Sequence, residues 1–144
     1  MRSNWDVKLG HGVGPLKFGA TLDAVTALLG KPSYELENND GLVYRNLGIL
    51  CNFEPKTRRL SSVELKPSHG FTLAGEQLPV ELPMLIEVLS IHGVRLQREE
   101  GDSTLYLDDK WHVMVFMEDG VVDSIVFGVL YDDAGDNIQW PDGQ

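Results

Sequence analysis

The sequence has one cysteine, Cys51, so it can form no internal disulfide and no Cys-x-x-Cys metal site. No apolar stretch approaches the ~18 residues of a membrane span, and the N-terminus lacks the apolar core of about 7 to 15 residues that marks an export signal. The 144 residues are the usual size of one domain that is stable without a disulfide or a structural metal. We therefore expect one cytoplasmic domain with no membrane contact, in which Cys51 is a buried thiol.

The sequence also lacks the spacings that mark catalytic, cofactor and metal sites. No two of its four histidines lie three or four residues apart, the spacing that places two ligands on one helix face. Gly10, Gly12 and Gly14 lead to Pro15, where a dinucleotide loop needs a third glycine after two intervening residues. No serine lies in a Gly-x-Ser-x-Gly elbow, and no acidic cluster fits a calcium loop. We expect no catalytic residue, no cofactor and no metal.

Positive charge is scarce in the second half of the chain. Residues 1 to 70 hold nine Lys and Arg and seven Asp and Glu, which gives a net charge of +2. Residues 71 to 144 hold three Lys and Arg and fifteen Asp and Glu, which gives a net charge of −12. Such a field repels nucleic acid and anionic membranes and attracts a basic protein. The alternative is an acidic surface that serves solubility alone.

The chain divides into two weakly similar halves. The sequence offset between Gly30 and Gly93 is 63, and the offset within each of the pairs Tyr44/Tyr106 and Ser62/Ser124 is 62. The predicted fold is α+β, one domain built as a tandem pseudo-repeat with halves at about 13–66 and 71–130 and an acidic tail at 131–144. Each half contributes a helix and antiparallel strands, and the helices pack on one face of an antiparallel sheet. A chance match between amphipathic segments is the alternative.

Local signals place the elements. Thr21 as an N-cap and Gly30 as a stop predict a helix at 21–29, and Pro83 and Gly93 frame a second. Residues 1–20 are expected to be irregular, and residues 67–70 are expected to form a linker. Residues 113–117 are apolar on both faces, which predicts a central strand covered on one side by a helix and on the other by a further element or a partner. The predicted strands are 42–44, 48–53, 60–65, 94–97, 103–107, 111–117 and 121–130.

The segment from Gly19 to Pro32, followed by Tyr44, resembles the Gly-x-Thr-x-x-x-Val-x-x-Leu-Leu-Gly-x-Pro opening of small bacterial outer-membrane assembly lipoproteins. The doubled layout resembles the tandem architecture of the beta-lactamase inhibitory protein, and small acidic cytosolic proteins of this build are similar to immunity proteins. These resemblances imply a helix-on-sheet unit whose doubled, concave sheet grips another protein. They carry over no binding residues.

From these features we expect a non-enzymatic immunity protein that binds and neutralises a basic partner, a cognate antibacterial toxin, through its acidic half. Carboxylates would steer the encounter, and aromatic side chains would anchor the complex. The oligomeric state stays open, and so do two alternatives: an enzyme or small-ligand binder with a site between the halves, and an intracellular assembly or scaffold domain. The predicted partner-binding residues are Trp140, Tyr131, Asp132, Asp133, Glu100, Trp111 and Asp109; Trp111 has burial in the core as its alternative interpretation.

Overall fold

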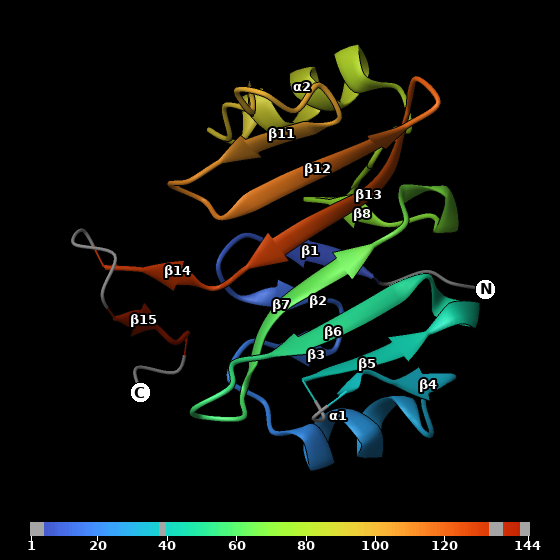
Figure 1. The fold of residues 1–144 in the computed structure, drawn as a ribbon, viewed down its shortest axis with the longest axis vertical. Helices are drawn as coiled ribbons and strands as arrows, with labels where there is room; N and C mark the ends of the chain where they lie inside the picture. Colours follow the sequence, from blue (N-terminus) through green and yellow to red (C-terminus); the bar gives the residue numbers. More distant parts are fainter. Residues whose placement is uncertain (1–4, 38–39, 133–136, 142–144) are drawn as a thin grey trace.

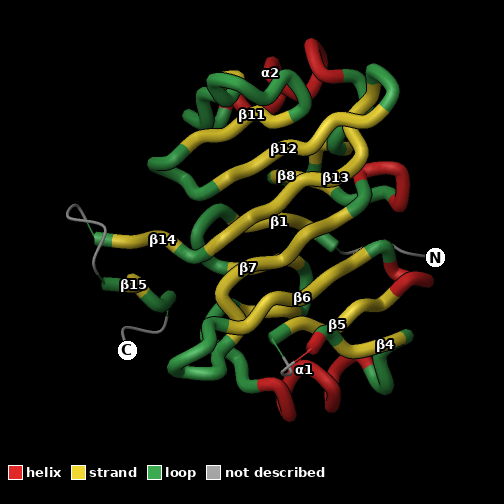
Figure 2. Tube along the Cα trace, in the orientation of Figure 1, coloured by secondary structure: helices red, strands yellow, loops and turns green. Residues whose placement is uncertain are grey.

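The computed structural model describes residues 5–37, 40–132 and 137–141, which form a mixed α and β fold with mostly antiparallel sheets. A large sheet is backed by a small sheet, and the helices α1 (Leu22–Leu29) and α2 (Leu82–Ile91) lie at opposite ends of the large sheet (Figure 1). More of the chain lies in strands than in helices (Figure 2). The short 3-10 turns η2 (Arg45–Leu47) and η3 (Pro67–His69) close two of the connections.

The large sheet has eight strands in the order β10-β11-β12-β13-β7-β6-β5-β4, and each neighbouring pair is antiparallel. Strands β7 and β13 meet in the middle, where Leu65 pairs with Ile125 and Ser62 pairs with Gly128. On each side of this seam the strands follow one another in chain order. Their bounds are β4 (Tyr34–Glu35), β5 (Gly41–Tyr44), β6 (Ile49–Phe53), β7 (Leu60–Leu65), β10 (Gln97–Arg98), β11 (Leu105–Asp108), β12 (Val113–Glu118) and β13 (Val121–Gly128).

Both helices form where the sequence predicts them. The Thr21 hydroxyl accepts a hydrogen bond from the Ala24 amide at 3.1 Å, which caps the first turn of α1, and Gly30 ends the helix with φ of 85°. Helix α2 has Pro83 in its first turn and ends before Gly93. Each helix turns one apolar side toward the same core as the large sheet. The buried helical residues are Val25, Leu85, Val88 and Leu89.

The strand predicted at 94–97 forms later in the chain, as β10. The Val94 amide donates to the Leu89 carbonyl at 3.0 Å, and the Arg95 amide donates to the Asp108 carboxylate at 2.6 Å. These backbone groups are therefore used to end α2 and to join it to β11, and sheet pairing begins only at Gln97.

A second, five-stranded sheet lies behind the large one, in the order β3-β2-β1-β8-β9. The prediction that residues 1–20 are irregular was therefore wrong. These strands have only two or three residues each, too few for an alternating pattern to emerge in a sequence. Asp6 accepts hydrogen bonds from the Thr72 hydroxyl at 2.6 Å and the Gly75 amide at 2.9 Å, which ties the parallel strands β1 and β8 together. The bounds are β1 (Asp6–Lys8), β2 (Gly12–Val13), β3 (Leu16–Lys17), β8 (Thr72–Leu73) and β9 (Glu76–Gln77).

One hydrophobic core joins the two helices, the small sheet and one face of the large sheet. Cys51 is fully buried in it, as expected from the sequence, and burial raises the pKa of its thiol to about 12. Beyond β13, the strands β14 (Leu130–Tyr131) and β15 (Ile138–Gln139) pair with one another beside the large sheet.

Candidate protein-binding surface

The large sheet has one face in the core and one face that we call the open face. The strand pairings define a row across the open face with one residue from every strand, because residues paired across antiparallel strands point to the same side. Over the described residues, no helix or strand lies on this face (Figure 1). The row runs Gln97, Leu107, Met114, Val126, Glu64, Leu50, Val43 and Tyr34.

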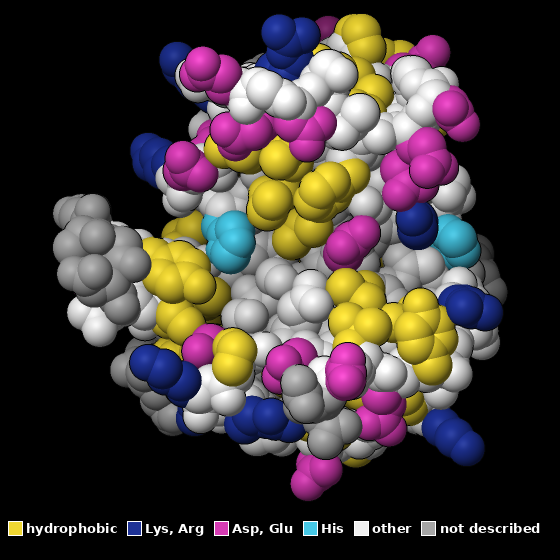
Figure 3. Space-filling view, in the orientation of Figure 1, with side chains coloured by type: hydrophobic (Ala, Val, Ile, Leu, Met, Phe, Trp, Pro, Cys, Tyr) yellow, Lys and Arg dark blue, Asp and Glu magenta, His cyan; other side chains and the backbone are white. Residues whose placement is uncertain are grey.

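Apolar side chains gather on the open face over β11, β12 and β13, where they form the yellow group in the upper middle of Figure 3. None of them belongs to the core cluster or to the partly buried residues packed against it, although Val126 is itself buried, with 7% of its surface exposed. They lie opposite one another across the strands: Leu105 pairs with Phe116, Leu107 with Met114, and Met114 with Val126. We call this group the apolar patch, and it consists of Leu105, Leu107, Met114, Phe116 and Val126.

Glu64 lies next to the apolar patch, at the centre of the open face. Its register partners are Val126 on β13 and Leu50 on β6, so apolar side chains flank it on both sides. The carboxylate is half-buried and forms no hydrogen bond or ion pair with any described residue. A carboxylate in this setting gains by meeting a cation, because it is already partly removed from water.

Further acids border the patch at the ends of its strands. Asp109 follows β11 and Glu118 ends β12, and both are exposed. Asp102 precedes β11, and the hydrogen bond from the Thr104 hydroxyl at 2.6 Å lowers the pKa of its carboxyl. The patch is therefore an apolar surface with a negatively charged rim.

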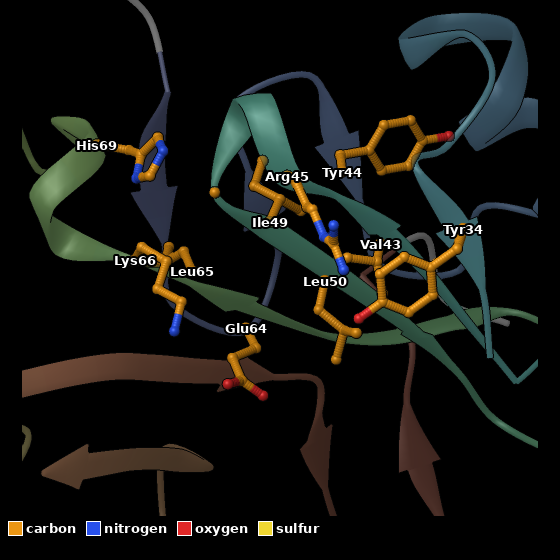
Figure 4. Close-up of a pocket in the computed structure, with 11 residues that line it drawn as sticks. Tyr34, Val43, Tyr44, Arg45, Ile49, Leu50, Glu64, Leu65, Lys66 and His69 are labelled. Atoms are coloured by element: carbon orange, nitrogen blue, oxygen red, sulfur yellow. The ribbon is translucent and has the colours of Figure 1, made fainter. Parts of the chain in front are cut away.

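A pocket of about 360 Å³ lies on the same open face, at the end away from the apolar patch, between β5, β6, β7 and the turns η2 and η3 (Figure 4). The Arg45 guanidinium lies over the Tyr34 ring at 4.9 Å, and the Lys66 amino group donates to Asp123 at 3.0 Å. The aromatic ring and the aliphatic stem of Arg45 thus form one wall. The lining residues are Tyr34, Val43, Tyr44, Arg45, Gly48, Ile49, Leu50, Glu64, Leu65, Lys66 and His69.

Three of the residues predicted from sequence to bind the partner lie together beside the large sheet. Tyr131 is 44% exposed, with its ring 5.8 Å from that of His112. Trp140 is half-buried beneath the Arg59 guanidinium at 5.6 Å. Asp132 accepts a hydrogen bond from the Asn137 side chain at 2.9 Å. Tyr131 and Trp140 line the same shallow hollow, and Asp133 lies outside the described residues.

The other three predicted residues are separate from that group. Trp111 is half-buried against the core, and its amide donates to Asp108 at 3.1 Å. Asp109 is exposed in the turn after β11, and Glu100 is exposed in the loop before it. None of the predicted residues lies in the row across the open face, so their role in partner binding stays a prediction.

Apart from Phe116, for which burial in the core was favoured over partner binding, the sequence did not single out the residues of the apolar patch or Glu64. The signal that pointed to them was the run 113–117, which is apolar at every position: Val113 and Val115 face the core, whereas Met114 and Phe116 face outward. Glu64 gave no signal, because a single acid in a strand is typical of a solvated sheet face.

No family model, no curated protein and no solved structure matches the chain. Among the described residues, no helix is long and apolar enough to cross a membrane. In the same part of the chain, no three His, Cys, Asp or Glu side chains come together in a way that could hold a metal ion.

Proposed function

We propose that this protein binds a basic protein partner on the open face of its large sheet and blocks the partner's activity, as an immunity protein neutralises an antibacterial toxin in the cytoplasm. One observation carries the proposal: the apolar patch, in which four side chains are partly exposed and Val126 is buried, lies on the open face next to the Glu64 carboxylate, which has no partner among the described residues. Apolar surface gathered in this way marks interaction sites more often than it serves stability.

The chemistry of the surface supports a division of roles. Burial of the patch supplies binding free energy, at about 25 cal/mol for each Å² of apolar surface removed from water. Glu64 selects a partner that places a Lys or Arg at the centre of the contact, because an apolar partner would leave the carboxylate buried without a cation. The surrounding acids raise the rate of encounter with a basic protein, and salt weakens this effect.

We propose further that the large sheet arose from two copies of one unit, each a helix followed by four strands in chain order. The row across the open face supports this, because equivalent positions keep nearly constant offsets. The sequence offset is 63 between Tyr34 and Gln97 and 62 between Glu64 and Val126, close to the value of 63 between Gly30 and Gly93. Duplication would double the width of the surface available to a partner.

The experiment that tests this function begins with the tagged full chain in its native cells. Proteins that copurify at low salt are identified, and each basic candidate is expressed in a host with and without this protein. The proposal expects one candidate to be toxic alone and harmless with the wild-type chain. Recovery of a toxic protein is not sufficient by itself, because the open face must also be shown to bind it.

Matched variants test the surface. Glu64→Lys and Met114→Lys change the open face and are expected to abolish both copurification and protection. Glu87→Lys and Ile91→Lys introduce the same charges on the exposed side of α2, where Ile91 is 67% exposed, and are expected to protect like wild type. Equal protection by all four variants would place the contact elsewhere. The sequence-predicted site then becomes the next test, through Trp140→Ala and Tyr131→Ala.

A further inference from the structure

The pocket beside η2 and η3 has an apolar floor and two charged groups that face it. Its volume of about 360 Å³ is at the small end of the range of roughly 300–1,000 Å³ in which small-molecule sites fall. Val43 and Leu50 contribute side chains from neighbouring strands, paired across β5 and β6, and Ile49 and Leu65 lie behind them in the core. The floor thus suits an aliphatic group of a few carbon atoms.

The two charged groups stand on different sides of the floor. Figure 4 shows the Arg45 guanidinium beside Tyr34 and the Glu64 carboxylate on β7, with Leu50 between them. No ion pair joins Arg45 to Glu64, and neither has an ion-pair partner among the described residues. Arg45, which is exposed, instead rests on the ring of Tyr34.

The other ionisable side chains that line the pocket, Lys66 and His69, make contacts within the fold. Lys66 donates to Asp123 at 3.0 Å and forms a partly exposed ion pair with it. His69 packs its ring against the backbone of Gly48 at the opposite wall. The pocket therefore offers a ligand one guanidinium and one carboxylate.

This combination discriminates between ligand classes. An anion without a cationic group would pair with Arg45 and be repelled by Glu64, and a simple amine would meet the reverse situation. A neutral apolar molecule would cover both charged groups and pair with neither, which costs desolvation free energy. A zwitterion with an aliphatic side chain satisfies both groups and the floor together.

We infer that this pocket binds an aliphatic α-amino acid, with its carboxylate on Arg45, its ammonium group on Glu64 and its side chain on the floor formed by Val43 and Leu50. A guanidinium holds a carboxylate through two parallel hydrogen bonds, which suits the first contact. The site goes beyond the proposed function, because ligand binding needs Arg45 and no partner protein, although both proposals place a cationic group on Glu64, so the amino acid and the partner would exclude each other there.

The test is calorimetric titration of the full chain with leucine and with two analogues that each lack one charged group, 4-methylpentanoate and 3-methylbutylamine. Leucine is expected to bind, and each analogue is expected to bind at least ~10-fold more weakly, a difference of about 1.4 kcal/mol. Amide chemical shifts are expected to change at Gly48 and Leu50. Arg45→Gln and Glu64→Gln are each expected to weaken leucine binding by a similar factor, whereas Lys56→Gln, on the exposed hairpin before β7, leaves it unchanged. Thermal melting of each variant checks that it is folded.

Three results would overturn the inference. The first is the absence of binding by leucine, isoleucine, valine and methionine up to about 10 mM, which is about tenfold above a Kd of 1 mM. The second is binding of 4-methylpentanoate as tight as that of leucine, which would indicate an anion site. The third is a set of shift changes away from the pocket. Arg45→Gln separates this inference from the proposed function, because the variant loses the amino acid and keeps the protein partner if both proposals hold.

Discussion

The imidazole ring of His69 lies so close to the backbone of Gly48 that a Cβ atom on Gly48 would stand 2.6 Å from two atoms of the ring. Gly48 ends the turn η2 in the left-handed region, with φ of 69°. The contact brings the turns η2 and η3 together, and these turns form one end of the pocket on the open face. Glycine at position 48 is therefore required both by the backbone conformation and by the space that the ring takes.

Gly48→Ala is expected to destabilise the protein by roughly 2–3 kcal/mol, because left-handed strain of about 1 kcal/mol adds to displacement of the His69 ring. Chemical denaturation measures the effect. Gly101→Ala is the matched control: Gly101 has φ of 84°, but a Cβ there would meet nothing within 4 Å, so only the strain of about 1 kcal/mol applies. Equal losses in the two variants would contradict a close contact between His69 and Gly48.

Neighbouring residues of β12 are expected to differ sharply in their contribution to stability. Val115 faces the core with no exposed surface, so Val115→Ala should lower the free energy of unfolding by roughly 2 kcal/mol. Met114 belongs to the apolar patch outside the core, so Met114→Ser should cost less than about 1 kcal/mol. Urea denaturation of both variants decides the matter. A cost for Met114→Ser equal to that of Val115→Ala would mean that the open face is covered.

Ser124 carries a buried hydroxyl that has no hydrogen-bond partner among the described residues. Ser124→Ala is expected to raise the free energy of unfolding by up to about 1 kcal/mol, because it removes a polar group that lost its water on folding. Ser62→Ala should act in the opposite direction by a similar amount, since the Ser62 hydroxyl accepts a hydrogen bond from the Asn52 side chain at 3.2 Å. Thermal denaturation of the two variants shows whether each substitution raises or lowers the free energy of unfolding. A loss of stability in Ser124→Ala would reveal a partner for that hydroxyl.

Cys51 is expected to make the protein less stable as the pH rises above about 9. Burial raises the pKa of the folded thiol to about 12 from an ordinary value of 9.0, so in this window the unfolded chain releases a proton that the folded chain retains. Stability from this group is present below pH 9 and falls by about 1.4 kcal/mol for each pH unit above it, until the folded thiol also ionises. Comparison of urea denaturation at pH 8 and pH 10 with that of Cys51→Ala isolates the effect, and parallel pH profiles for the two proteins would contradict it.

The sequence predicted the parts of the fold that have strong local signals. Thr21 and Gly30 delimit α1 within one residue, and the strand predicted at 60–65 forms over that range. The small sheet was missed because β1 and β8 come from distant parts of the chain, as in the match of Asp6 to Thr72, and no local pattern reports such a contact. Pairing between distant strands depends on the packing of the whole core, so it cannot be predicted from a sequence segment of a few residues.

The candidate surface was harder to predict than the fold. Aromatic and acidic residues such as Trp140 and Glu100 attract attention in a sequence, whereas Met114 and Val126 look like ordinary core residues. Their position on the open face follows from the register of β12 against β13, and a shift of one residue would exchange them with Val115 and Ile125. Pocket residues such as Arg45 and Glu64 come from different elements, so only the folded chain shows that they share a site.

The central position of β7 in the large sheet sets a condition on the synthesis of the protein. Strand β7 can pair with β13 only after the ribosome has synthesised Ile125, the register partner of Leu65 in the second half of the chain. At about 5–20 residues per second, the nascent first half leaves a six-residue strand edge unpaired on the ribosome for roughly 3–12 seconds. An unpaired strand edge recruits other strands, so we expect slower translation through the second half to give the chain more time to aggregate before the native sheet forms.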